Sequence, residues 1–310
     1  MRTLPAEGFA HDFHIALTRR PRAISPKYFY DEAGSRLFER ICELPEYYPT
    51  RTEMALLRAH GREMADLIGP GATLIEYGAG ALRKVRLLLE HLDAPAAFVP
   101  IDISGPHLLG ACRDLQREHP ALTIRPLVAD FSRPHELPGR AVAARRIGFF
   151  PGSSLGNFAP DEALAFLKLA AEELRGGGLL IGVDLIKAPE ILHAAYNDRE
   201  GVTAAFNLNL LARARRELCA DLDLAGFAHS AFYNAPLARV EMHLQARRKQ
   251  AIVLGDQRYE LDEGETLHTE NSHKFSVAGF QALARRAGFV PEQVWCDARS
   301  WFSLHWLRAP

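Results

Sequence analysis

Residues 76–84 combine residue types that can bind a nucleoside. They read Glu-Tyr-Gly-Ala-Gly-Ala-Leu-Arg-Lys and directly follow a short apolar run. Gly78 and Gly80 leave the backbone bare, so a ligand can approach it closely. The next apolar run, residues 97–101, ends in Asp102, which is 24 positions after Gly78 (102 minus 78). An acid at this place can bind both ribose hydroxyls, so the pattern predicts an adenosine site.

Three kinds of protein can carry this glycine turn. A dinucleotide-binding enzyme requires a third glycine three positions after the second, and Arg83 stands there instead. The shorter form, acid-x-Gly-x-Gly, resembles the first motif of class I methyltransferases that use S-adenosylmethionine. A structural turn in another α/β domain is the third alternative, because Gly-x-Gly by itself is a weak signal.

Two further polar segments follow predicted strands, where open α/β sheets bind ligands. Asp130 can accept a hydrogen bond from an adenine amino group while the Phe131 ring packs beside the purine. Residues 151–158 read Pro-Gly-Ser-Ser-Leu-Gly-Asn-Phe. Asn157 in this loop can bind a carboxylate through its N–H groups or an amine through its oxygen. The alternatives are a turn cap beside a core phenylalanine, and a polar loop that leads into a helix.

Polar and aromatic residues also gather in segments that predict structured loops when each is taken alone. These segments are residues 45–52, 195–198 and 268–274. Glu270 can hold a cationic or imidazole N–H group through a charge-assisted hydrogen bond. Met242 alternates with Val240 and Leu244 on a predicted strand. It is therefore a core residue by default, and the wall of a pocket is the alternative.

Alternating strand and helix periods between residues 53 and 187 predict the elements that position these motifs. Strands are expected at 74–77, 98–102, 124–128, 147–150 and 179–185, and helices at 54–68, 83–91, 106–118 and 160–174. Buried apolar strands separated by amphipathic helices predict an α/β fold, in which a parallel sheet carries helices on both faces.

The pattern changes after residue 187. Residues 188–220 are mostly helical, and alternating strands follow at 239–246, 250–254 and 258–261. A helix at 276–287 and strands at 294–297 and 302–307 would complete a seven-stranded sheet whose last strand is antiparallel. The aromatic N-terminal part shows a helical patch at 34–42 and no strand period. We therefore expect a methyltransferase domain over 53–187 and 274–310, and a substrate-binding lobe over 1–52 and 188–273.

The composition limits the function classes. The chain of 310 residues is 48% hydrophobic and 24% charged, with a formal net charge of −1, so no global field favours nucleic acid or an anionic membrane. It lacks an apolar signal segment and a membrane-spanning run. The four cysteines are far apart without a Cys-x-x-Cys pair, and the histidines are scattered. We expect a cytoplasmic protein with free thiols and no metal.

Several long segments resemble the histidine Nα-methyltransferases of ergothioneine biosynthesis. The most specific are Leu-Pro-Glu-Tyr-Tyr-Pro-Thr-Arg-Thr-Glu at 44–53 and Ala-Tyr-Asn-Asp at 195–198. The resemblance extends over nearly the whole chain and includes 28–38, 76–89, 149–158, 182–187 and 269–274. It implies a Rossmann-like, seven-stranded class I methyltransferase sheet with a second α+β substrate-binding lobe. It also implies transfer of three methyl groups from S-adenosylmethionine to the α-amine of free L-histidine, which gives hercynine.

The resemblance implies a role for each matching residue. The methyl donor would be surrounded by Tyr30, Gly78, Lys84, Asp102, Asp130 and Phe131. The substrate carboxylate would be held by Asn157 and Tyr196. The imidazole would be read by Tyr47, Glu270 and Ser272, in a pocket shaped by Met242 and Phe206. Tyr30, Gly152 and Asn157 would orient the reacting amine, with Ser154 near it. The resemblance also implies a monomer that acts on histidine and its mono- and dimethyl forms.

The chain departs from the family at the glycine turn, where Ala79 and Ala81 replace the usual serine or threonine, and at His273, which replaces an aromatic residue. The alanines predict weaker donor binding, and His273 leaves the exact side-chain preference open. Three alternatives stay open at this point. They are methylation of another amino acid such as tryptophan, a nicotinamide-dependent oxidoreductase, and a non-catalytic binding protein.

Overall fold

The computed structural model describes residues 8–138 and 145–310, and the chain divides into two compact units. The sheet unit comprises Tyr48–Lys187 and His273–Pro310. The second unit comprises Met1–Tyr47 and Ala188–Ser272. Each unit therefore contains two separate stretches of sequence, and the chain passes between the units three times.

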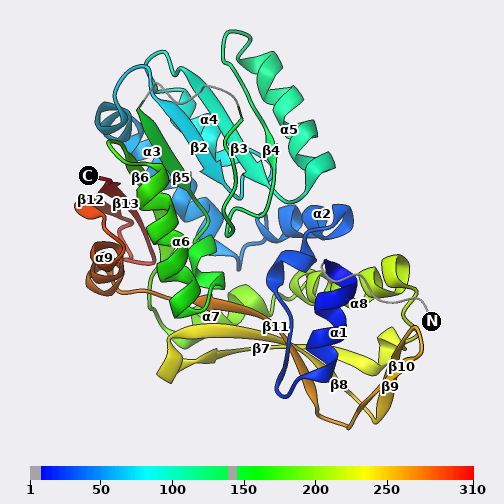
Figure 1. The fold of residues 1–310 in the computed structure, drawn as a ribbon. Coiled ribbons are helices and arrows are strands. Elements are labelled where there is room, and N and C mark those ends of the chain that lie inside the picture. The colour runs from blue at the N-terminus through cyan, green and yellow to red at the C-terminus, as the bar shows by residue number, and fades with distance from the viewer. Residues whose placement is uncertain (1–7, 139–144) are drawn as a thin grey trace. The chain divides into compact units, whose positions relative to one another are not determined.

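The sheet unit contains a seven-stranded sheet in the order β12-β13-β6-β5-β2-β3-β4 (Figure 1). Its strands are β2 (Thr73–Tyr77), β3 (Ala97–Asp102), β4 (Leu127–Val128), β5 (Arg146–Phe150), β6 (Gly178–Asp184), β12 (Val290–Cys296) and β13 (Phe302–Arg308). Strand β13 runs antiparallel to both of its neighbours, and the neighbouring strands among β2 to β6 pair in parallel. The predicted seven-stranded α/β sheet with an antiparallel last strand is confirmed.

Helices cover both faces of this sheet, because neighbouring strand residues point to opposite sides. Leu74 and Phe98 belong to a core with α3, α4 and α5, whereas Ile75 and Val99 belong to a core with α6 and α9. The helices are α3 (Tyr48–Ile68), α4 (Arg83–Leu89), α5 (Gly105–Glu118), α6 (Pro160–Glu173) and α9 (Val277–Arg286). Because strands β2 to β6 run parallel between these two cores, the loops that follow them lie at one edge of the sheet, the carboxyl edge.

The second unit combines helices with a four-stranded sheet in the order β1-β11-β8-β7 and a separate β9–β10 hairpin. The strands are β1 (Arg22–Ala23), β7 (Phe227–Asn234), β8 (Arg239–Ala246), β9 (Gln250–Leu254), β10 (Gln257–Leu261) and β11 (Thr266–His273). The helices are α1 (Phe9–Thr18), α2 (Glu32–Ile41), α7 (Pro189–Tyr196) and α8 (Val202–Leu218), and 3₁₀ turns include η1 (Pro26–Phe29).

The sequence prediction misses part of this second unit. It omits α1, β1 and β7, and it expects a loop at 268–274, where the structure has β11. The polar sequence Thr266–His273 forms a strand because it pairs with β1 and β8 inside a sheet, and tertiary pairing outweighs its weak intrinsic strand preference. In the sheet unit, β4 is limited to two residues, with a single bridge from Ile124 to Phe98.

The four cysteines are free thiols, as expected from their spacing. Of the helices in the described part of the chain, none has both the length and the apolar character needed to cross a membrane.

Candidate functional site

The glycine turn after β2 adopts the conformation that its sequence predicts. Gly78 and Gly80 have φ angles of 69° and 53°, in the left-handed region that favours glycine. A Cβ atom on Gly78 would lie 3.2 Å from Cε1 of Phe131, so only glycine leaves room for that ring. Asp102, at the end of β3, accepts hydrogen bonds from the Gly80 and Ser104 N–H groups at 3.0 and 2.8 Å. The turn and the acid are thus joined directly.

The loop after β4 places Asp130 and Phe131 at the same edge. Asp130 accepts hydrogen bonds from the Ser132 N–H group and hydroxyl at 3.1 and 2.5 Å. The Phe131 ring packs against Phe150 and Phe166, with centroids 5.4 and 5.8 Å away. Phe131 is therefore part of an aromatic cluster that holds its ring beside the glycine turn.

Lys84 and Gly152, both predicted site residues, are joined by Glu53, which the sequence prediction did not select. Glu53 lies on α3 and is completely buried. Its carboxylate accepts the Gly152 N–H at 2.9 and 3.0 Å and forms an ion pair with Lys84 Nζ at 2.6 Å. A Cβ atom on Gly182 of β6 would overlap the Glu53 carboxylate. Glu53 therefore fixes the loop after β5 to the first turn of α4.

Glu76 provides a second buried acid in the sheet unit. It is 1% exposed, and its Oε2 atom has no hydrogen-bond partner among the described residues. Burial raises the pKa of Glu76 well above its ordinary value, and the positive charge of Lys84 opposes this rise only partly. An unpartnered acid at the end of β2 is suited to a cationic ligand group, because that charge would stabilise the carboxylate.

The loop that follows β5 is held in one shape by the backbone and by Ser153. Ser153 has a φ of 58°, and its hydroxyl accepts the Asp184 N–H at 2.9 Å. Gly156 approaches the backbone of His273 so closely that an added Cβ atom would lie 2.8 Å from its carbonyl oxygen. Asn157 ends the 3₁₀ turn η3 (Ser154–Asn157) and is half-buried.

Asp184 at the end of β6 carries the densest charge cluster in the described part of the sheet unit. Its carboxylate accepts the Tyr48 hydroxyl at 2.7 and 2.8 Å, Lys187 Nζ at 2.6 Å and Lys274 Nζ at 2.7 Å. Burial would raise the pKa of Asp184, but the charges of Lys274 and Lys187 outweigh it and lower the pKa. Burial lowers the pKa of Lys187 to about 8. The cluster therefore contains an ionised carboxylate held by two cations.

In the second unit, three predicted site residues lie within a connected aromatic group. The Tyr30 ring packs edge-on against Phe206 with centroids 5.8 Å apart, and Phe38 contacts both Phe206 and Tyr47. Desolvation raises the pKa of Tyr47 well above 10, and the negative charges that Tyr196 and Glu270 can carry raise it further. The Tyr47 hydroxyl therefore stays protonated at neutral pH.

Strand β11 brings the remaining polar groups together. The Tyr196 hydroxyl, at the end of α7, donates to Ser272 Oγ at 2.7 Å. Glu270 is 8% exposed and Met242, on the neighbouring strand β8, is 2% exposed. The second unit thus contains a carboxylate, three tyrosine hydroxyls and a serine hydroxyl among large apolar side chains, a combination that can bind a small amphipathic molecule.

A buried network supports these residues from α8. Asn207 is completely buried; its amide donates to His229 Nδ1 at 2.9 Å and to the His243 carbonyl at 3.0 Å. The Thr269 hydroxyl bonds Asn207 Oδ1 at 2.8 Å and the Met242 carbonyl at 3.0 Å. These bonds assign the His229 proton to Nε2, which donates to the Tyr196 carbonyl at 2.9 Å. The network therefore ties the strand of Met242 and the end of α7 to one helix.

The predicted site residues fall into two groups, one in each unit. The sheet unit contains Gly78, Lys84, Asp102, Asp130, Phe131, Gly152 and Asn157, and the second unit contains Tyr30, Tyr47, Tyr196, Phe206, Met242, Glu270 and Ser272. Sequence reasoning missed Glu53, which contacts Lys84 and Gly152, and Asn207, which is linked to Tyr196 through His229. It also missed Asp184, which bonds Tyr48, Lys187 and Lys274. An acid three and four positions before Leu56 and Leu57, on the apolar side of an amphipathic helix, was the available signal for Glu53.

Comparisons with known proteins match nearly the whole length of the sequence. The sequence profile of a family described as "Histidine-specific methyltransferase, SAM-dependent" matches residues 9–309. A histidine N-alpha-methyltransferase of Mycolicibacterium smegmatis is 39% identical, over 96% of this chain and 94% of that protein. The Mycobacterium tuberculosis protein of the same name is 38% identical, over 94% of this chain and 92% of its own length.

A fungal relative matches over a smaller share of its own length. Ergothioneine biosynthesis protein 1 of Neurospora crassa is 30% identical, over 93% of this chain and 33% of the fungal protein. The family resemblance inferred from the sequence motifs is confirmed.

Proposed function

This chain belongs to the SAM-dependent, histidine-specific methyltransferases, and we propose that it methylates the α-amine of free L-histidine three times to give hercynine, the first step of ergothioneine biosynthesis. The observation that carries the proposal is the glycine turn of β2, which is joined to Asp102 and faced by Phe131 in a chain of this family. The relatives named above supply the substrate class.

The sheet unit would bind the methyl donor, S-adenosylmethionine. Its residues fit the parts of that molecule: Asp102 matches the ribose hydroxyls, and Asp130 and Phe131 match the adenine. The methionine part carries both an ammonium and a carboxylate group. The unpartnered Glu76 Oε2 suits the ammonium, and Lys84 suits the carboxylate. When bound, the donor supplies a methyl group on a positively charged sulfur.

The second unit would bind the amino acid. Glu270 accepts a hydrogen bond from an imidazole N–H in this proposal, and Tyr47 and Ser272 contribute hydroxyl groups beside it. Met242 and Phe206 form apolar walls. Tyr196 would bind the substrate carboxylate, and Asn157 of the sheet unit is proposed for the same group.

The remaining requirement is a neutral amine, because a protonated nitrogen has no lone pair. An α-amino group has a pKa of about 8, so only a modest shift is needed and a strong dedicated base is unnecessary. Tyr30, the Gly152 loop and Asn157 would orient the nitrogen, which is the main contribution of an enzyme when the donor is already reactive. We expect the rate of methylation to rise between pH 6 and 8. A rate that is constant over this range would contradict a limiting step that needs the neutral amine.

The deciding experiment is a turnover assay with purified protein and S-adenosylmethionine. Histidine, its mono- and dimethyl forms and tryptophan are each supplied, and methylated products are measured by mass spectrometry. The proposal predicts trimethylated histidine from the first three substrates and no comparable turnover of tryptophan. Preferred turnover of tryptophan would assign the chain another amino acid. Binding of both ligands without any product would identify a non-catalytic protein.

A further inference from the structure

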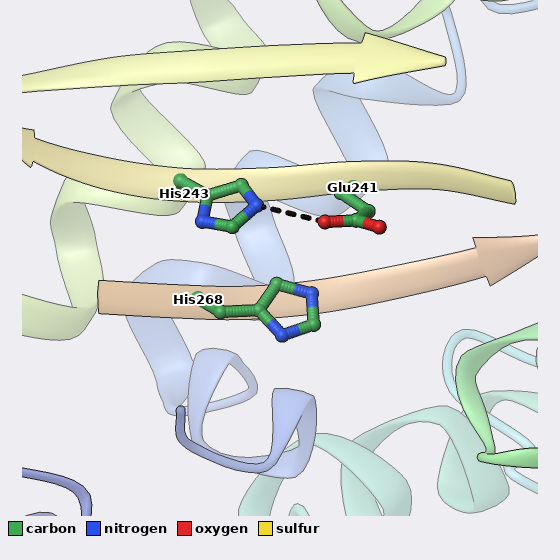
Figure 2. Close-up of side chains that lie close together, drawn as sticks. All are labelled: Glu241, His243 and His268. Carbon is green, nitrogen blue, oxygen red and sulfur yellow. Dashed lines mark hydrogen bonds and ion pairs between the residues drawn. The ribbon is translucent and has the colours of Figure 1, made fainter. Parts of the chain in front are cut away.

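Three side chains of the kinds that bind transition metals meet on one face of the second unit's sheet (Figure 2). Glu241 and His243 are two positions apart on β8, so they point to the same side. His268 lies on β11, the neighbouring strand. One ligand atom from each residue lies within 4.8 Å of the others. Spacing along the chain cannot reveal this group, because strand pairing joins residues 25 or more positions apart.

The oxygens of Glu241 have separate partners. Oε1 accepts Asn234 Nδ2 at 2.8 Å and Arg239 Nε at 2.9 Å, which fixes the orientation of the carboxylate. Oε2 faces His243 Nε2 at 3.1 Å. At metal sites, a ligating carboxylate is usually held in place by hydrogen bonds to its other oxygen. Arg239 is a cation that competes for this carboxylate, but it bonds Oε1, and Oε2 faces the imidazole of His243.

Each imidazole has a lone pair available. His243 Nδ1 is buried and has no hydrogen-bond partner in the part of the chain that the structure describes. His268 Nε2 bonds the carbonyl oxygen of Glu270 at 2.9 Å, which assigns the proton to Nε2 and the lone pair to Nδ1. The two rings stack with centroids 4.7 Å apart. Coordination of one ion at about 2.0–2.2 Å per ligand therefore requires both rings to turn and the hydrogen bond between His243 Nε2 and Glu241 Oε2 to break.

We propose that Glu241, His243 and His268 form a reversible binding site for a first-row divalent transition metal ion, such as Zn²⁺ or Co²⁺. Two imidazoles and one carboxylate suit these ions, whereas Mg²⁺ and Ca²⁺ prefer oxygen ligands alone. Three protein ligands leave positions open for water.

The test uses full-length, tag-free protein treated with chelator and kept free of histidine, since histidine itself binds metals. Zn²⁺ binding is measured by calorimetry, and Co²⁺ binding by its visible absorption. The expected result is one ion per chain, a visible band from nitrogen and oxygen ligands, and no response to Mg²⁺. Glu241→Gln and His268→Ala should each weaken binding about tenfold or more. His193→Ala, which removes an exposed histidine of the same unit, should leave it unchanged.

Circular dichroism and urea unfolding serve as the folding control for every variant, because the substituted residues lie in the second unit. Equal metal affinity in wild type, Glu241→Gln and His268→Ala would overturn the proposal. So would the absence of a saturable Co²⁺ band in the wild type. Neither outcome depends on methyl transfer. Failure of the metal proposal would therefore say nothing against the proposed methyltransferase activity, which the turnover assay tests separately.

Discussion

The residues proposed to bind the donor lie at or near the carboxyl ends of parallel strands, whereas those proposed to bind the amino acid come from helices, a 3₁₀ turn and two strands of a mixed sheet. The first group is fixed by topology, because the carboxyl ends of parallel strands meet at one edge. The second group depends on long-range packing, such as the Tyr30 ring against Phe206 and the Tyr196 hydroxyl on Ser272. The donor site can thus be formed by a repeated strand–helix pattern, whereas the specificity for the acceptor depends on long-range contacts between particular side chains.

The largest effect is expected in the sheet unit. Asp102→Ala should weaken binding of S-adenosylhomocysteine about 100-fold, because two charged hydrogen bonds to ribose are worth about 3 kcal/mol together. Calorimetry on purified protein measures this affinity, and histidine affinity serves as the readout for the second unit. Asp256→Asn, in an exposed turn, is the matched control. A loss of affinity smaller than about threefold would mean that Asp102 does not bind the donor.

A change of the acceptor carboxylate should affect only the second unit's ligand. Glu270→Ala is expected to weaken histidine binding by about 1–3 kcal/mol, the scale for a lost hydrogen bond to a charged group. The affinity for S-adenosylhomocysteine should stay within a factor of about two. Titration calorimetry with each ligand distinguishes the two cases. Unchanged histidine affinity would remove Glu270 from the imidazole site.

Acid should destabilise the sheet unit through His305. Burial lowers the pKa of His305 to about 4, whereas an exposed histidine has about 6.5. Between these values the unfolded chain binds the extra proton, so stability rises with pH and falls on acidification. For His305 alone, the loss at pH 5.5 is about 1.2 kcal/mol relative to neutral pH. The raised pKa of Glu76 in the same unit acts in the opposite direction, so the effect of His305 is the difference between the wild type and a His305 variant.

Tryptophan fluorescence can follow this effect, because Trp295, Trp301 and Trp306 all lie in the sheet unit. Unfolding by urea at pH 7 and 5.5 measures the difference, which should shrink in His305→Leu. The pKa values of His229, His243 and His268 are also lowered, but they lie in the second unit. An equal pH effect in wild type and variant would assign it to other groups.

The smallest expected effect tests a single hydroxyl. Tyr196→Phe removes the donor to Ser272 and keeps the ring in place. Histidine affinity should fall by about 1 kcal/mol, or about fivefold, with the donor affinity unchanged. A larger loss, equal to that of Glu270→Ala, would mean that Tyr196 organises the pocket as well as binding one group.

The sequence indicates the common location of the proposed donor residues more directly than that of the proposed acceptor residues, for a physical reason. Gly78, Asp102 and Asp130 each follow a strand whose apolar period is visible, so their common location follows from the sheet. Strand β11 is polar, and only its pairing with β8 and β1 makes it a strand. The same limitation hides Glu53, whose partners Lys84 and Gly152 are far away in sequence. It also hides the contact between His243 and His268.

The cluster around Asp184 has a consequence for the chain's connectivity. The chain enters or leaves the sheet unit at Tyr48, Lys187 and His273, and Tyr48, Lys187 and Lys274 all bond the one Asp184 carboxylate. A single carboxylate thus holds the sheet-unit end of each of the three connections. A force on any of these connections would act on Asp184, and replacing this one residue would weaken all three attachments.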